Sequence, residues 1–157
     1  MQEAWPTPDQ VFRTANILAL LGWLSLGVGV ALRQERIRTL LAGRAIPLLL
    51  AAGYVAILGA HWSESSGSFS SLAGVASLFQ SPWLLLAGWV HYLAFDLFIG
   101  TWIAADADAI AAPRWLLVLV LPAVFLFGPA GFLLWFLLKA SVFSPLIKQA
   151  AQERISS

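Results

Sequence analysis

The sequence contains no cysteine and few charged residues, and both shortages narrow what the protein can do. Without cysteine the chain has no disulfide, no thiolate metal ligand and no cysteine nucleophile. Charged residues make up 11% of the 157 residues and hydrophobic residues 60%, whereas soluble domains have roughly 25% and 45–50%. The nine lysines and arginines are scattered and the net charge is +1, so no basic surface for nucleic acid is expected. This composition excludes an ordinary soluble domain and a nucleic-acid-binding protein.

Long apolar segments fill the chain almost from end to end. A helix needs roughly 20 apolar residues to cross the core of a bilayer, because its backbone polar groups must be satisfied within the segment. Four segments are predicted to cross, residues 8–32, 46–61, 82–105 and 113–139. The connections between them, residues 33–45, 62–81 and 106–112, are short enough to join antiparallel neighbours. We therefore predict an all-α fold, an integral membrane antiparallel four-helix bundle forming a single membrane domain over residues 1–157.

Local signals mark the boundaries of these elements. Thr7 is followed by Pro8 and, three residues after itself, by Gln10, which predicts a capped helix start. In the second connection, apolar residues recur at spacings of three and four, which predicts a short helix on the membrane surface over about residues 68–80. The tail from Ser141 to Ser157 contains Pro145 and is expected to bend along the interface.

Basic residues predict the orientation in the membrane. The first connection carries four arginines and is expected on the cytoplasmic side: Arg33, Arg36, Arg38 and Arg44. If the chain crosses four times, Arg114 lies on the same side as these arginines and the remaining four basic residues lie outside. Both termini are then expected outside. The opening residues, Met1-Gln2-Glu3, lack the basic region of a signal peptide and the composition of an organelle transit peptide. The chain is expected to lie in contact with membrane lipid.

The third apolar segment contains two ionisable side chains near its middle, His91 and Asp96. An Asp at the centre of a membrane helix costs roughly 2.5–3.5 kcal/mol, so Asp96 is expected to face protein and to be paired, hydrogen-bonded or protonated. Five helical residues place the two side chains roughly 140° apart around the axis. They either form interhelical hydrogen bonds that fix the bundle or mark a substrate, ion or proton site.

Other residues of the third and fourth segments suggest a ligand groove. Tyr92, Asp96 and Gly100 share a stripe at intervals of four, and Trp89 lies close to it, too deep for the interfacial aromatic belt. An aromatic groove of this kind suits a long conjugated or isoprenoid ligand. Pro122 and the pair Gly128-Pro129 interrupt the fourth segment, where they produce either a kink or a binding site.

The ligand-type side chains do not have the spacing of a metal centre. His61 and Asp106 belong to opposite membrane surfaces, and no Glu-x-x-His or His-x-x-x-His pattern directs two ligands from one helix face. No glycine-rich phosphate loop precedes a helix. We therefore predict no bound metal and no phosphate chemistry.

Two sequence motifs resemble the abscisic acid-deficient 4-like family of small four-helix membrane proteins, formerly a domain of unknown function. They are the run from Trp89 to Gly100 with the following Asp106, and Phe125-Leu126-Phe127-Gly128-Pro129-Ala130-Gly131. The resemblance extends over about residues 11–140 and is densest in 82–138. Plant members are associated with neoxanthin formation, in which an epoxide of violaxanthin opens to an allene. They also carry a plastid-targeting extension that this sequence lacks, so the resemblance implies the plasma membrane of a bacterium.

The resemblance implies an isomerase or binding protein for a carotenoid or another long apolar ligand, working without a redox cofactor. His91 and Asp96 would then be the catalytic acid/base pair, one donating a proton to oxygen and the other accepting the proton lost from the polyene. The candidate ligand-binding residues are Trp89, Tyr92, Gly100, Trp102, Asp106, Phe127, Gly128 and Pro129.

Two further readings stay open. A non-enzymatic bundle could move protons or a small solute past Asp96, although few polar residues accompany it in the third segment. The chain could also be a structural partner of another membrane protein or form a homo-oligomer. A carotenoid site requires an apolar groove, whereas a transport path requires more polar residues on both sides of Asp96.

Overall fold

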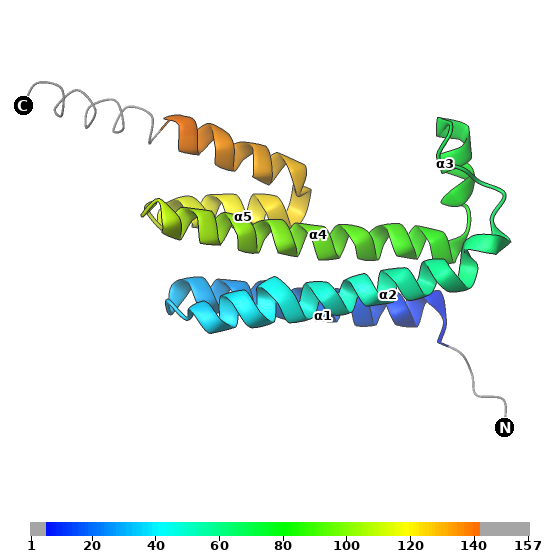
Figure 1. The fold of residues 1–157 in the computed structure, drawn as a ribbon, viewed down its shortest axis with the longest axis horizontal. Helices are drawn as coiled ribbons and strands as arrows, with labels where there is room; N and C mark the ends of the chain where they lie inside the picture. The colour runs from blue at the N-terminus through cyan, green and yellow to red at the C-terminus, as the bar shows by residue number, and fades with distance from the viewer. Residues whose placement is uncertain (1–5, 142–157) are drawn as a thin grey trace, which may run out of the picture. The chain divides into compact units, whose positions relative to one another are not determined.

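A computed structural model describes residues 6–141, so the expected interfacial tail lies outside the described residues. Within this range every regular element is helical (Figure 1). The elements are α1 (Pro8–Ala31), the π-helix η1 (Ile37–Ala45), α2 (Ile46–His61), the 3-10 turn η2 (Trp62–Glu64), α3 (Leu72–Leu78), α4 (Pro82–Ala109), α5 (Trp115–Phe127) and a helix over Pro129–Ser141. The chain divides into two compact units, the first ending at Thr101 and the second beginning at Trp102.

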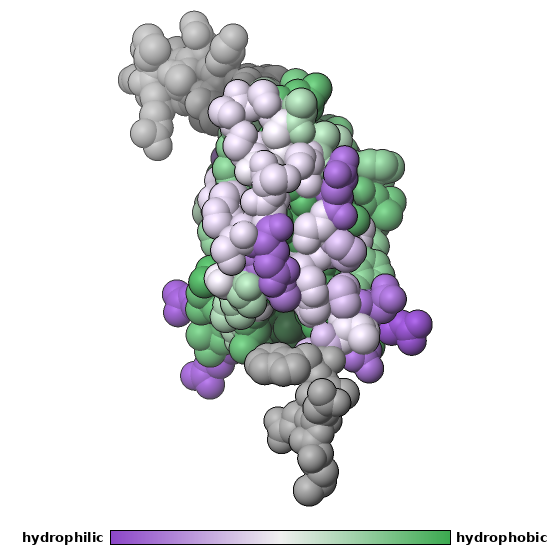
Figure 2. Space-filling model, turned by 90° about the vertical axis from the view of Figure 1, so that its right-hand side faces the viewer, coloured by the Kyte–Doolittle hydropathy of each residue, from purple (hydrophilic) through white to green (hydrophobic). Residues whose placement is uncertain are grey.

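Three helices are long and apolar enough to cross a membrane. They are α1 with 24 residues, the continuous helix Ile37–Glu64 with 28, and α4 with 28. Large apolar side chains on them face outward, among them Ile17, Leu48 and Phe95, each more than half exposed. At the end of the first unit where α3 lies, hydrophilic side chains gather (Figure 2). An apolar wall with polar groups at its end is the surface that a membrane protein presents to lipid and headgroups.

The start of α1 has the predicted capping box. The backbone N–H of Gln10 donates to Thr7 Oγ1 at 3.3 Å, and the backbone N–H of Thr7 donates to Gln10 Oε1 at 2.8 Å. These bonds satisfy donors that a helix start otherwise leaves free, and Pro8 occupies a first-turn position where no donor is needed.

The first connection is mostly helical, so its prediction as a loop over residues 33–45 was wrong. The chain turns at Arg33, which has a φ of 56°, and η1 then runs directly into α2. A Cβ on Gly29 would lie 3.0 Å from the backbone N of Arg38. The absence of a side chain at Gly29 therefore lets η1 pack closely against α1, a contact that local sequence patterns do not reveal.

Small residues also join α1 to α4 in the first unit. A Cβ on Gly100 would lie 2.7 Å from the Trp23 ring, and a Cβ on Gly22 would meet the side chain of Leu97. Leu26 and Leu97 are both fully buried. This small-to-large packing brings membrane helices into close contact, where dispersion forces hold them.

The surface helix was predicted over residues 68–80, and the structure has α3 over Leu72–Leu78. The Ser71 side chain caps it by accepting a hydrogen bond from the backbone N–H of Gly74 at 3.0 Å. Leu78 is 4% exposed, so α3 packs on the rest of the first unit through this residue. Its position on a membrane surface stays a prediction.

The predicted fourth crossing over residues 113–139 is two short helices, which corrects the four-helix bundle. α5 has 13 residues and ends at Phe127; the next residue, Gly128, has a φ of 25°. The next helix, Pro129–Ser141, doubles back along α5 (Figure 1). A Cβ on Gly131 would meet the backbone of Val124, so the two helices touch closely at the turn. Each is shorter than the roughly 20 residues of a crossing, as in re-entrant membrane segments.

The third helix is longer than predicted at its C-terminal end. α4 continues to Ala109 and therefore includes Asp106, which was expected in the connection 106–112. The chain reverses only at Ala111, whose φ is 52°. Side chains from the helix Pro129–Ser141 satisfy the Asp106 carboxylate, which lets a helix accommodate an acidic residue in its last turns.

Candidate functional site

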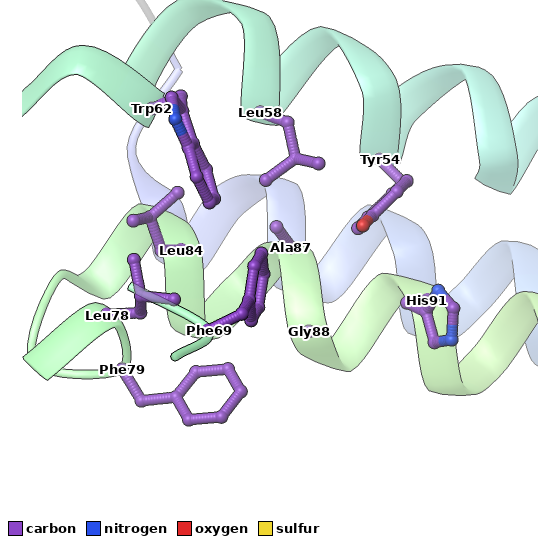
Figure 3. A pocket seen from close by; sticks show the side chains of 10 residues that line it. All are labelled: Tyr54, Leu58, Trp62, Phe69, Leu78, Phe79, Leu84, Ala87, Gly88 and His91. Carbon is purple, nitrogen blue, oxygen red and sulfur yellow. The ribbon is translucent and has the colours of Figure 1, made fainter. Parts of the chain in front are cut away.

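A cavity of about 260 Å³ lies on the side of α4 that faces α2 (Figure 3). Its wall is formed by α2, η2, α3, α4 and the segment before α3. The lining residues are largely aromatic or aliphatic: Tyr54, Leu58, Trp62, Phe69, Leu78, Phe79, Leu84, Ala87, Gly88 and His91. All of them belong to the first unit.

The outer wall of the cavity consists of stacked aromatic rings. The Trp62 and Phe69 ring centroids lie 5.5 Å apart with their planes tilted by 28°. A Cβ on Gly88 would lie 2.9 Å from the Phe79 ring. Glycine at this position therefore lets Phe79 rest on α4, and the short helix α3 holds Phe79 in place at its C-terminal end.

Two polar side chains line the end of this cavity away from α3, Tyr54 from α2 and His91, which is exposed, from α4 (Figure 3). Their ring centroids are 5.4 Å apart. The His91 ring also stacks on Phe95 at 4.6 Å with an angle of 23°, which restrains its orientation. An imidazole and a phenol at the end of an apolar cavity can each donate a hydrogen bond to a ligand oxygen or accept one from a ligand hydroxyl.

A second polar group lies on another face of α4. The Tyr92 hydroxyl hydrogen bonds to the Asp96 carboxyl group, and Asp96 is 7% exposed. Asp96 Oδ2 is buried, and none of residues 6–141 provides it with a hydrogen-bond partner. The Trp89 ring lies 5.4 Å from Tyr92, and its Nε1 donates to Asn16 Oδ1 of α1 at 3.3 Å. The predicted residues Trp89, Tyr92 and Asp96 are thus neighbours in the structure.

The structure gives His91 and Asp96 separate surroundings, consistent with their angular separation. His91 contacts Tyr54 and Phe95, while Asp96 contacts Tyr92. Of these two residues, only His91 lines the cavity. Tyr54 is therefore better placed than Asp96 to act together with His91 on one ligand.

The other predicted binding residues have structural neighbours of their own. Gly100 provides the close approach to Trp23. In the second unit, the Trp102 ring lies 5.8 Å from Phe132, and Asp106 accepts hydrogen bonds from Trp135 and Lys139. Phe127 is 66% exposed at the end of α5, before the Gly128-Pro129 turn. Gly100 therefore packs the first unit, and the other positions belong to the second unit, away from the cavity lining.

A family model described as ABA DEFICIENT 4-like matches residues 10–135, which include every candidate site residue, the helices Ile37–Glu64 and Pro82–Ala109, and all of α1 except its first two residues. The chain belongs to the ABA DEFICIENT 4-like family. This confirms the resemblance carried by the Trp89–Gly100 run and the Gly128-Pro129 segment. No curated protein and no solved structure matches the chain. The site of this ABA DEFICIENT 4-like protein is therefore interpreted from its own geometry.

Sequence reasoning missed most of the cavity wall. Tyr54, Leu58 and Trp62 lie four residues apart on one stripe of α2 and η2, a pattern that predicts a shared face. Phe69 and Phe79 flank α3, and no spacing rule directs them toward α4. His61 was expected at the interface; it stacks on Trp83 at 4.4 Å and contacts Glu64 at 3.2 Å, outside the cavity.

Proposed function

We propose that this ABA DEFICIENT 4-like protein is a membrane-embedded isomerase or binding protein for a carotenoid or a related isoprenoid. The observation that carries the proposal is the aromatic cavity with the Tyr54 and His91 rings 5.4 Å apart at one of its ends. The ligand's cyclic end group would occupy this cavity, with its oxygen facing the two polar side chains. The plasma membrane of a bacterium remains the proposed location.

The size of the cavity limits what part of a carotenoid it can hold. Ligand pockets commonly measure roughly 300–1,000 Å³, and this cavity, at about 260 Å³, falls just below that range. It suits one substituted ring better than a whole carotenoid. Aromatic walls provide large apolar contact to such a ring at little cost in side-chain entropy.

The chemistry implied by the family can be carried by the two polar side chains. Opening an epoxide to an allene moves one proton from a polyene carbon to the epoxide oxygen, so no electrons are gained or lost. His91 would accept the proton from carbon while the Tyr54 hydroxyl donates its proton to oxygen. Transfer of the proton from His91 back to Tyr54 then restores both groups. Positioned general acids and bases of this kind contribute roughly 10²–10⁴-fold to a rate.

Transport past Asp96 is less well supported. A proton or ion path needs polar groups in sequence across the membrane. The contacts described for the Asp96 group are a tyrosine, Tyr92, and beyond it the Trp89 ring. Thr101, the nearest polar residue toward the end of α4, donates its hydroxyl to the Leu97 carbonyl at 3.0 Å and so is already paired within the helix.

The test is conversion of violaxanthin by membranes that contain the protein, followed by chromatography of the pigments. His91→Ala and Tyr54→Phe should each reduce formation of the allenic product by about 100-fold or more if both groups transfer protons. His61→Ala is the matched control, because the chain has two histidines and His61 lies outside the cavity. Bound but unconverted violaxanthin would favour a binding protein. If the membranes neither bind nor convert violaxanthin, the proposal is wrong.

A further inference from the structure

A second hollow of about 350 Å³ follows the same seam between α2 and α4, nearer the start of α2. Its lining is almost entirely apolar, with Arg44 at one end. The lining residues are Gly43, Arg44, Pro47, Leu48, Ala51, Ala94, Phe95 and Phe98. This hollow is called the seam groove below.

The seam groove and the aromatic cavity lie end to end. On α2 the lining residues Pro47, Ala51, Tyr54 and Leu58 recur at intervals of three or four and so share one stripe. The facing stripe of the antiparallel helix α4 alternates in the same way, through Phe98, Phe95, His91 and Gly88. On each of the two helices, the residues that line the groove and those that line the cavity therefore lie on the same face.

His91 and Phe95 form the junction. Phe95 lines the seam groove, His91 lines the cavity, and their stacked rings lie 4.6 Å apart. A ligand oxygen held by His91 and Tyr54 would therefore lie where the two hollows meet. Any chain attached to that oxygen-bearing end group can continue directly over Phe95 into the groove.

From these observations we propose that the seam groove holds the polyene chain of the same ligand whose end group occupies the cavity. This inference rests on the proposed function and adds to it a separate site for the ligand's chain, distinct from the cavity that takes its oxygenated ring. Trp62 lies fifteen residues after Pro47, so the two hollows extend about 22 Å at ~1.5 Å per helical residue. That is most of the thickness of a bilayer core, roughly 30 Å.

The character of the groove favours a rigid chain over a phospholipid tail. Small residues line it from both helices, Ala51 from α2 and Ala94 from α4, and they leave space beside the exposed side chains of Leu48 and Phe98. A conjugated chain is already extended, so it loses little conformational freedom on binding, whereas a saturated acyl chain loses much more. Arg44, which is exposed, marks where the slot reaches the headgroup level.

Two probes separate the groove from the cavity: violaxanthin, which has the ring and the chain, and β-ionone epoxide, which has the ring alone. Their affinities for purified protein in mild detergent are measured by ligand-dependent thermal stabilisation. Ala51→Phe fills the groove. It should weaken violaxanthin binding about tenfold or more and leave β-ionone epoxide binding unchanged. Ala52→Phe is the matched control, because Ala52 is the next residue of α2, is exposed and lies outside the groove.

A second variant guards against misfolding of the first. Phe98→Ala removes a wall of the groove and should also weaken violaxanthin binding selectively. If Ala51→Phe and Phe98→Ala both bind violaxanthin as the wild type does, the groove inference is wrong while the proposed function stands. If these variants lose copurifying phospholipid but keep their affinity for violaxanthin, the groove holds a lipid tail. That outcome would also overturn the groove inference. If the wild type binds neither probe, the proposed function fails and the inference with it.

Discussion

The Lys139 ammonium group lies 2.7 Å from Oδ2 and 2.9 Å from Oδ1 of the Asp106 carboxylate. Trp135 Nε1 donates to the same Oδ2 at 2.9 Å, and Trp135 is fully buried. The last helix of the described chain is therefore fastened to the end of α4, close in sequence to the start of α5. These contacts close the helical hairpin of the second unit.

Removing the carboxylate should destabilise this hairpin. Asp106→Ala leaves the buried Trp135 N–H without an acceptor, which costs about 1–3 kcal/mol, and also removes the ion pair. Asp106→Asn keeps an acceptor for Trp135 and should cost less. Thermal unfolding in detergent measures both variants, with the exposed Glu35→Gln as the control. Equal stability of Asp106→Ala and the wild type would show that the hairpin is held by other contacts.

The hairpin predicts that Ser141 returns to the arginine-rich side of the membrane. With α1, Ile37–Glu64 and α4 crossing, the connection after α1 and the end of α4 face the same side. The chain has no cysteine, so single cysteines can be placed at the exposed residues Gln34, Ser66 and Ser141. A membrane-impermeant maleimide should label Gln34→Cys and Ser141→Cys from the same side and Ser66→Cys from the other. Ser141→Cys labelled together with Ser66→Cys would restore the fourth crossing.

The sequence predicted the three long helices because their length, apolar content and the Thr7 cap act locally. It could not distinguish a fourth crossing from a hairpin, since residues 113–139 are equally apolar in both. Gly128-Pro129 marked the interruption, but whether the chain kinks or reverses depends on the φ of Gly128, 25°. The reversed arrangement is held by the contacts of Asp106 with Trp135 and Lys139. These residues lie 29 and 33 positions after Asp106, so local sequence patterns do not reveal the contacts.

Gly128 should resist substitution at the turn. Its φ of 25° lies in a region that side chains rarely adopt, so Gly128→Ala should destabilise the protein by about 1 kcal/mol or more. Gly59→Ala is the matched control, because a Cβ on Gly59 of α2 meets nothing within 4 Å. The control should be neutral or slightly stabilising. The comparison is made by thermal unfolding, and an equally mild effect at both positions would argue against a strained turn.

Asp96 should matter less to the reaction than His91. Asp96→Asn keeps the shape of the side chain and an acceptor for the Tyr92 hydroxyl, so violaxanthin conversion should stay within about threefold of wild type. Proton flux into proteoliposomes is measured alongside it. Conversion abolished in a folded Asp96→Asn protein would restore Asp96 as the partner of His91. A wild-type proton flux that disappears in the variant would favour the transport reading.

Part of the candidate site was predictable because a membrane interior makes His91 conspicuous. Its partner was not: Tyr54 lies 37 positions away on another helix, and only the packing of α2 against α4 brings the rings together. The aromatic wall depends further on α3, which positions Phe79 against Gly88. Local patterns identify which residues share a helix face, but not which faces meet.

The most direct test of the account is the pigment carried by protein purified in mild detergent from a carotenoid-producing host. Leu58→Trp fills the cavity, and Val55→Trp makes the same change on the exposed side of α2. The account predicts a carotenoid absorption band in the wild type and in Val55→Trp, and its loss in Leu58→Trp. A colourless wild type, or an undiminished band in a folded Leu58→Trp protein, would contradict a ligand site between α2 and α4.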